Sequence, residues 1–313
     1  MRIAVIGAGI MGTGIAQVMA EGGCDVALQS RRRESLDGAL ERMRKNHDQM
    51  IAAGLLAPPD AEAARTRVRL TQDLGDAVRD ADFVSENVPE DLALKQVLFG
   101  ALDRLAPPRA ILSTDTSGLS ITAIAGATGR PERVVGFHWF NPPHLMLPVE
   151  VICGEKTSEE TMRATCALAE RVGRRPIRVE RDVPGFLWNR LQLALIREAV
   201  HIVEQKIATP EDVDLAVQWG LGFRWAAVGP LRIVDLAGLG TFRAIAAYLF
   251  PELSAASAPQ PLMEEAVAKG HLGARAGKGF YDYPPGAHEA LIRERDARLL
   301  ALRRVLSSRK GSP

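Results

Sequence analysis

The sequence predicts an α/β fold, in which a doubly wound and mostly parallel sheet is followed by an all-helical C-terminal domain. Residues 2–6 form an apolar segment typical of a buried parallel strand, and the segment Gly7-Ala8-Gly9-Ile10-Met11-Gly12 follows it directly. From residue 187 to residue 205, apolar side chains recur at helical spacing. We therefore expect a Rossmann-type sheet domain over residues 1–182 and a helical domain over residues 183–313.

The glycine-rich segment predicts a dinucleotide site. In such a motif the first glycine permits a tight turn, the second lets a pyrophosphate approach the backbone, and the third lets the helix pack on the strand. A helix over residues 10–21 would offer its N-terminal amides to the phosphates. A lone motif is weak evidence, but a second strand over residues 26–29 follows at the expected distance. The expected cofactor contacts here are Gly7, Gly9, Ile10, Met11 and Gly12.

The end of that second strand bears on the choice of cofactor. NAD-specific folds usually place an acid there, which binds the ribose 2′-hydroxyl. Here the sequence is Gln29-Ser30-Arg31-Arg32-Arg33, with no acid before Glu34. Guanidinium groups suit a 2′-phosphate, which they can bind with two hydrogen bonds. The alternative, that the arginines are only solvated surface charges, is weakened because the helix dipole disfavours three cations at a helix N-terminus. We predict NADP rather than NAD, with Ser30, Arg31 and Arg32 in contact with it.

A histidine and a glutamate within residues 136–151 form the candidate catalytic pair. His138 ends one apolar run, Glu150 lies in another, and the prolines between them exclude a helix. A strand, a tight corner and a returning strand could bring the two side chains together. A carboxylate on one imidazole nitrogen leaves the other free to accept a proton. Taken alone, a core histidine with a satisfied partner is the simpler interpretation; the glycine motif favours the catalytic one.

The rest of the chain alternates between strand and helix before becoming helical. Small hydroxyl residues follow the strand expected at residues 110–113, so Ser117 could contact a ligand, cap a helix, or do both. Further helices are expected at residues 35–53 and 92–105 and from Pro210, further strands at 67–70 and 81–86, a loop at Pro58-Pro59, a helix break at 219–225, and an amphipathic tail helix at 288–309.

Six segments recur in this order in a known family: GAGIMGTGIAQ, ENVPEDLALK, STDTSGLSI, GFHWFNPPHLMLPVEV, DVPGFLWNRL and GARAGKGFYDY. On these motifs, the chain resembles the 3-hydroxyacyl-CoA dehydrogenase family over nearly its whole length. NPPH, GEKT and LGFRWAAVGP look more like its branch acting on small free hydroxy acids. That branch includes L-gulonate 3-dehydrogenase (lambda-crystallin), carnitine dehydrogenase and a pyridine-carboxylate dehydrogenase of pyridoxine breakdown.

The resemblance implies catalytic roles residue by residue. His138 matches the family's catalytic histidine, and Glu150 matches its carboxylate partner. Ser117 and Asn189 match residues near the substrate oxygen, and Asn141 matches the asparagine after the histidine.

The resemblance also bears on the cofactor and the assembly. Glu90 and Lys95 match cofactor-contacting positions, and Ser30 stands where the family usually has aspartate, which puts NAD use in doubt. The resemblance further implies a homodimer formed through the helical domain, which would also contact the substrate.

These features together predict an NAD(P)-dependent oxidoreductase that interconverts a small secondary alcohol, such as a 3-hydroxy acid, and its ketone by hydride transfer. His138 would be the general acid/base. One alternative is an ordinary 3-hydroxyacyl-CoA dehydrogenase, for which either Arg44 and Lys45, or Arg65, Arg67 and Arg69, could bind the CoA phosphates, although charges on a helix face usually serve only solvation. Another is a non-catalytic, crystallin-like dinucleotide-binding protein, against which the intact set of candidate catalytic residues argues.

Composition excludes several other classes. The 313 residues carry a net charge of +1, which suggests neither nucleic acid nor an acidic membrane as a partner. No apolar run approaches the roughly 20 residues that span a bilayer. The three cysteines show neither a disulfide framework nor metal-ligand spacing, so we expect no metal. With no signal peptide before the first strand, a cytoplasmic location is expected.

Overall fold

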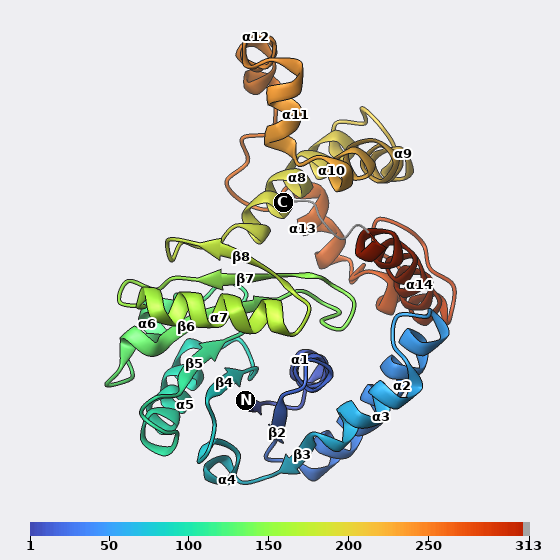
Figure 1. Cartoon of the computed structure of the whole chain (residues 1–313). Helices are drawn as coiled ribbons and strands as arrows, with labels where there is room; N and C mark the ends of the chain where they lie inside the picture. Colours follow the sequence, from blue (N-terminus) through green and yellow to red (C-terminus); the bar gives the residue numbers. More distant parts are fainter. Residues whose placement is uncertain (309–313) are drawn as a thin grey trace. The chain divides into compact units, whose positions relative to one another are not determined.

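A computed structural model describes residues 1–308, and an eight-stranded sheet organises the first part of the chain (Figure 1). The strand order is β3-β2-β1-β4-β5-β6-β7-β8, and every neighbouring pair is parallel except β6 and β7, which are antiparallel. The predicted fold class is thereby confirmed. The strands are β1 Arg2–Ile6, β2 Asp25–Gln29, β3 Val68–Thr71, β4 Phe83–Glu86, β5 Ile111–Thr114, β6 Val134–Trp139, β7 Pro148–Ile152 and β8 Arg175–Val179.

Helices cover both faces of the sheet, so the central strands are buried on both sides. Along β1, Ile3 and Val5 pack toward α1, α2 and α7, whereas Ala4 and Ile6 pack toward α4, α5 and α6. The helices of this part are α1 Ile10–Glu21, α2 Arg33–Ala52, α3 Pro58–Thr66, α4 Leu74–Val78, α5 Leu92–Leu105, α6 Ile121–Ala125 and α7 Glu159–Arg171, with a 3-10 turn at Pro131–Arg133.

Local sequence explains where several of these helices begin. Asp73, Asp91, Ser120 and Ser158 each precede a helix and accept a hydrogen bond from the backbone N–H three residues on. The Pro58-Pro59 stretch, predicted as a loop, instead begins α3, because proline is well tolerated in the first turn of a helix.

The remaining elements are helical. They are α8 Trp188–Glu204, α9 Pro210–Leu215, a π-helix at Ala216–Gly222, α10 Phe223–Ala227, α11 Pro230–Ala237, α12 Leu239–Leu249, α13 Pro261–Ala268 and α14 Ala287–Ser308, with 3-10 turns at Phe250–Glu252 and Ala274–Ala276. The predicted helix break at residues 219–225 is wrong: the chain stays helical through Gly222 and Phe223. A helical glycine costs only about 1 kcal/mol relative to alanine, which neighbouring turns can offset.

The chain divides into two compact units. The first comprises residues 1–190 together with the described residues from 295 onward, and the second comprises residues 191–294. This division differs from the expected boundary at residue 182, because the end of α14 packs within the first unit. Residue 309, the expected end of the tail helix, lies outside the described residues.

Within residues 1–308 no single helix is long and apolar enough to cross a membrane. Only α11 together with the helical stretch from Leu239 to Glu252 has enough length and apolar composition for a span, and these two helices are bent by 109° relative to each other.

Candidate active site

The antiparallel pairing of β6 with β7 places His138 directly opposite Glu150. The two side chains meet within the first unit: Nδ1 of His138 lies 2.7 Å from Oε2 of Glu150. Glu150 has no exposed surface and His138 is 5% exposed. The strand, corner and returning strand expected from the sequence are therefore present, and they bring the predicted pair into contact.

The second carboxylate oxygen of Glu150 is held by the chain itself. Oε1 accepts hydrogen bonds from the backbone N–H groups of Leu187 and Trp188, at 3.0 and 2.7 Å. Because these donors converge on both oxygens of the carboxylate, its orientation is fixed. Nδ1 of His138 is then the donor toward Glu150, and Nε2 can accept a proton. Sequence reasoning did not find the two backbone donors, since no side chain reveals them.

Aromatic rings enclose the imidazole. Phe140 and Phe186 lie 5.1 and 5.9 Å from the His138 ring, centroid to centroid, and Phe140 stacks on Trp188 at 4.0 Å. An apolar surround of this kind lowers the local dielectric constant and strengthens the His138–Glu150 interaction.

The turn between β1 and α1 fits a bound dinucleotide. Gly7 has φ +105°, and a Cβ on it would lie 2.6 Å from the carbonyl oxygen of Asn87. A Cβ on Gly12 would lie 1.9 Å from the carbonyl oxygen of Gly7. These two glycines permit the tight turn and its close packing, whereas a Cβ on Gly9 would meet no atom within 4 Å. Gly7 and Gly9 line a cleft of about 800 Å³, within the range of ligand pockets, and Gly12 does not. Its lining includes Gly7, Gly9, Ile10, Met11, Ser30, Arg31, Arg32, Ser35, Asn87, Val88 and Pro89.

The cation-rich end of β2 lies in this same cleft. Arg33 forms an ion pair with Asp37 at 3.0 Å and does not line it. Arg31 and Arg32 are exposed and form no ion pair with any described residue. Two of the three expected guanidinium groups are thus available to an anionic ligand at the cleft wall.

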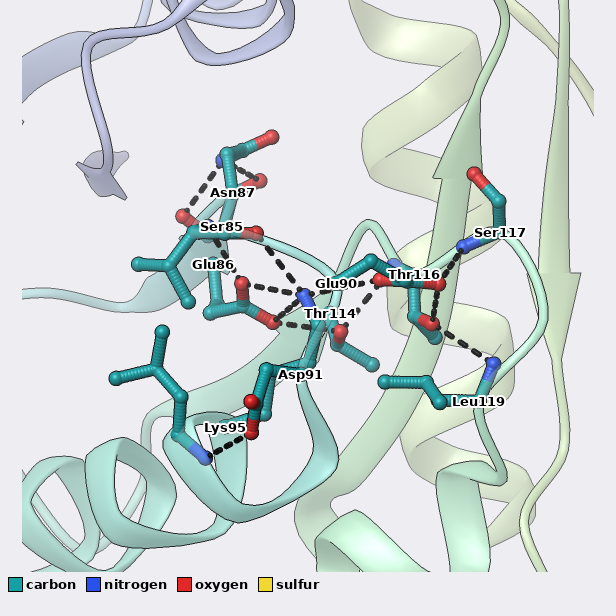
Figure 2. A network of polar contacts seen from close by, with 12 residues as sticks. Ser85, Glu86, Asn87, Glu90, Asp91, Lys95, Thr114, Thr116, Ser117 and Leu119 are labelled. Carbon is teal, nitrogen blue, oxygen red and sulfur yellow. Dashed lines mark hydrogen bonds and ion pairs between the residues drawn. The ribbon is translucent and has the colours of Figure 1, made fainter.

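A polar network follows the ends of β4 and β5 (Figure 2). Oε1 of Glu90 accepts hydrogen bonds from the backbone N–H of Ser117 at 2.9 Å and from the hydroxyl of Thr116 at 2.5 Å. The side-chain amide of Asn189 donates to the carbonyl oxygen of Ser117 at 2.8 Å. The structure therefore brings Ser117 and Asn189 together, and Glu90 holds the Ser117 turn from the other side.

Lys95 lies in the interior, away from the cleft. Its side chain is 1% exposed, and Nζ lies 2.7 and 2.9 Å from the two oxygens of Glu86, 3.3 Å from the carbonyl oxygen of Val88 and 3.5 Å from Glu90. Lys95, which matches a cofactor-contacting position of the family, here contacts Val88, one of the residues that line the cleft. Sequence reasoning placed Glu86 at a strand end near the cofactor but did not pair it with Lys95; Glu86 also accepts a hydrogen bond from the hydroxyl of Thr114.

Two further residues complete the edge of the sheet. Asn141 is exposed, and the peptide bond that joins it to Pro142 is cis. Asp115, which sequence reasoning missed, accepts a hydrogen bond from the backbone N–H of Trp139 at 2.8 Å, and burial raises its pKa well above the ordinary value. Its place directly after β5 was the available signal, since strand ends carry functional residues in such sheets.

A dinucleotide cleft and a buried histidine–carboxylate pair on one doubly wound sheet define the class of dinucleotide-dependent oxidoreductases. Residues 2–183 match the NAD binding domain of 3-hydroxyacyl-CoA dehydrogenase, and residues 185–283 match the C-terminal domain of the same enzymes. The chain belongs to the 3-hydroxyacyl-CoA dehydrogenase family and is a nicotinamide-dependent dehydrogenase.

Relatives differ in how much of the chain they match. The 5-formyl-3-hydroxy-2-methylpyridine 4-carboxylate 5-dehydrogenase of Mesorhizobium japonicum is 38% identical, over 99% of both chains. A crystal structure of an enzyme of that name, described as an NAD+ dependent dismutase, matches with a TM-score of 0.92 over 99% of both chains. A probable 3-hydroxybutyryl-CoA dehydrogenase of Bacillus subtilis is 39% identical, over 90% of this chain and 97% of that one.

Proposed function

We propose that this dehydrogenase oxidises a small hydroxy compound that is not a CoA thioester, with His138 as the proton acceptor and NADP as the preferred cofactor. The observation that carries the proposal is the 2.7 Å contact between His138 and a Glu150 carboxylate whose other oxygen is held by two backbone amides. This arrangement fixes one imidazole nitrogen as donor and keeps the other for the substrate.

The chain's own residues supply the proton chemistry. Nε2 of His138 takes the hydroxyl proton of the substrate as the adjacent C–H bond breaks, and in the reverse direction it returns that proton to the ketone. A bound nicotinamide cofactor supplies the carbon that accepts the hydride. Glu150 orients the imidazole and stabilises its cationic form, while Ser117 and Asn189 hold the oxygen on which charge develops.

The cofactor preference rests on the end of β2. Ser30, Arg31 and Arg32 line the cleft, and the two arginines have no carboxylate partner among the described residues. A 2′-phosphate would satisfy them, whereas a ribose 2′-hydroxyl would find no acid there. NAD stays the rival, because the family's domain is an NAD binding domain and the pyridine-carboxylate structure is described as NAD+ dependent.

The substrate class rests on likeness over the whole chain. The pyridine-carboxylate relative matches 99% of this chain, whereas the 3-hydroxybutyryl-CoA dehydrogenases match 90%. The second candidate is an acyl-CoA substrate, favoured by identities of 36–39% to the latter enzymes.

A panel assay tests the proposal. We would compare kcat/KM for the hydroxy compounds L-gulonate, L-carnitine, 3-hydroxybutyrate and 3-hydroxybutyryl-CoA, each with NAD and with NADP, and would assay the aldehyde 5-formyl-3-hydroxy-2-methylpyridine 4-carboxylate separately. A free acid with NADP should be fastest. Turnover of the CoA thioester alone, or a preference for NAD, would contradict the corresponding part of the proposal.

We further propose that the second unit pairs with a second copy of the chain. Within residues 191–294 only Val200 and Gln260 are buried, so this unit holds almost no core of its own. Its exposed large apolar residues include Trp219, Phe223, Leu231, Leu236, Leu239, Tyr248 and Phe250. So many exposed large apolar side chains in one unit favour an interface with another chain.

A further inference from the structure

We infer that the C-terminal part of α14 positions the active site by holding the loop that joins His138 to Glu150. We call residues 140–147 the connecting loop, and Leu300 and Arg303 of α14 the C-terminal brace. The inference deepens the proposed function, on which it rests, since the loop matters to turnover only if His138 and Glu150 act as proposed. All of these residues belong to the first unit.

The first contact of the brace is apolar. Leu300 is 8% exposed and packs in one cluster with Leu145 of the connecting loop and Met50 near the end of α2, which are 3% and 2% exposed. Leu299 lies partly buried against the same cluster. The end of α14 lies beside α2 (Figure 1). Leu145 in the loop is therefore buried by α14, which lies about 150 residues further along the chain.

The second contact is polar and acts on the loop backbone. Nη1 of Arg303 donates a hydrogen bond to the carbonyl oxygen of His144. From the other side, Nη2 of Arg174 reaches the carbonyl oxygens of Pro143 and His144 at 3.4 and 3.5 Å. Arg174 also lies 6.0 Å above the ring of Trp139, the neighbour of His138. Two guanidinium groups thus hold the loop, and one of them comes from α14.

The charges around the loop are compatible with this arrangement. Burial lowers the pKa of His144 to about 4, with nearby Asp296 and Glu21 opposing the shift and the two arginines adding to it. The imidazole is consequently neutral at neutral pH and does not repel Arg303 or Arg174. Asp296, on α14 itself, is 8% exposed and pairs with Arg295 at 2.7 Å.

The brace lies outside the part of the chain that matches the family. The matched C-terminal domain ends at residue 283, and α14 begins at Ala287. The 3-hydroxybutyryl-CoA dehydrogenases leave a tenth of this chain unmatched, whereas the pyridine-carboxylate relative matches 99% of it. The domain model of the family therefore ends before α14, and we treat the contact of α14 with the connecting loop as an addition to the site.

The addition acts on the geometry of catalysis. His138 and Glu150 stand on the two strands that the connecting loop joins, and Phe140 at its start contacts the imidazole ring. A displacement of about 1 Å in a catalytic group can cost on the order of 10²-fold in rate. Arg303 and Leu300 are thus positioning residues rather than catalytic ones.

Substitutions on one helix test the inference. Arg303→Gln removes the guanidinium group, and Leu300→Ala removes the apolar contact with Leu145. Arg303→Lys keeps a positive charge at the same position. Arg304→Gln is the matched control, because Arg304 is exposed on the same helix. The reporters of the loop are the backbone N–H groups of Leu145 and Met146, which donate to the carbonyl oxygen of Pro142 at 3.0 and 3.1 Å. The measurements are their hydrogen–deuterium exchange, the Kd for NADP, and kcat with the fastest substrate of the panel above.

We expect Arg303→Gln and Leu300→Ala to speed exchange of both amides by about tenfold or more and to lower kcat by about tenfold or more, with the Kd for NADP unchanged. Arg303→Lys should recover part of both effects, and Arg304→Gln should match the unsubstituted protein. Unchanged exchange, or faster exchange with unchanged kcat, would overturn the inference. If the unsubstituted protein turns over no compound in the panel, the proposed function fails, and exchange alone then decides whether α14 holds the loop.

Discussion

The carboxylate of Glu150 serves three donors at once: the His138 imidazole and the backbone N–H groups of Leu187 and Trp188. In Glu150→Gln one oxygen still accepts from the two backbone groups, so the fold should persist. The imidazole then faces an amide in place of a charge and loses both its fixed orientation and the stabilisation of its cation. We expect kcat to fall by about 10²–10⁴ with little change in cofactor affinity, measured by steady-state kinetics and cofactor titration.

Glu155→Gln is the control, since Glu155 is exposed near the end of the same hairpin. His138→Gln should show the same loss as Glu150→Gln, and the double variant should lose little more, because the two residues act as a unit. Wild-type turnover in either single variant would remove the basis of the proposed proton transfer.

Ser30, Arg31 and Arg32 line the cleft, and we expect them to decide the choice of cofactor. Ser30→Asp combined with Arg31→Ala and Arg32→Ala introduces an acid for the 2′-hydroxyl and removes the cations that suit a 2′-phosphate. The ratio of kcat/KM for NADP to that for NAD should fall by about 10²-fold or more, since each tenfold step needs only about 1.4 kcal/mol. Arg33→Ala, which removes a cation already paired with Asp37, should leave that ratio nearly unchanged.

His144 makes the fold sensitive to acid. The folded-state pKa of about 4 lies below the ordinary 6.5, so between these values the unfolded chain binds more protons at this site. Stability should therefore be lost as the pH falls from about 6.5 to about 4, by at most about 3 kcal/mol from this group at 1.36 kcal/mol per pKa unit. His144→Gln should flatten that part of the curve in urea unfolding measured at several pH values. An unchanged pH slope would show that other groups cause the acid sensitivity.

At the scale of elements, α1 and the connecting loop approach closely at Gly14. A Cβ there would lie 3.1–3.2 Å from three carbons of the Pro143 ring, and the loop around Pro143 is held by two arginines. Since the ring has little room to move, Gly14→Ala should destabilise the protein by about 1–3 kcal/mol and lower kcat. In Gly100→Ala, in the middle of α5, the new Cβ meets the carbonyl oxygen of Ala127 at 3.4 Å and Nη1 of Arg104 at 3.8 Å, both ordinary contacts, so stability should hold or rise by up to about 1 kcal/mol. Denaturant unfolding distinguishes the two cases.

Sequence reasoning succeeded where one local pattern dictates an element. The bounds of α1 and α5 were predicted correctly, because apolar spacing and flanking residues agree there. The β6–β7 hairpin was predicted because its prolines exclude helix. The reasoning failed at residues 219–225, where glycine and tryptophan suggested a break. A Cβ on Gly222 would lie 2.9 Å from the carbonyl oxygen of Val217, so this glycine serves a widened helical turn instead.

For the candidate site, residues on the hairpin and in the glycine turn were predictable, because their chemistry and spacing are local. The interior place of Lys95 was not: it depends on how α5 packs so that the lysine reaches Glu86 at the end of β4, and the residue types alone do not show that pairing. The backbone donors of Leu187 and Trp188 have no side-chain signature either.

At the scale of the whole molecule, the tail was the least predictable part. Its amphipathic pattern indicates a helix but does not say which surface it covers. Leu300 and Arg303 find their partners in the first unit, whereas the order of strands and helices in the sequence assigns the whole tail to the helical domain after residue 182. Contacts between residues 140–147 and 295–305 are long-range and leave no local pattern from which to predict them.

Self-association is the remaining prediction at this scale. In the second unit Leu236 and Leu239 are 76% and 68% exposed on α11 and α12, in a unit with almost no buried residue of its own. Exposing this much apolar surface to water is unfavourable, so a second copy of the chain should cover it. Light scattering should give twice the 33.9 kDa chain mass, and Leu236→Glu with Leu239→Glu should give one chain mass and a lower melting temperature. Val97→Glu, at a residue 74% exposed on α5 of the first unit, should leave the dimer intact. A single-chain mass for the unsubstituted protein at micromolar concentration would mean that the second unit is stable without a partner.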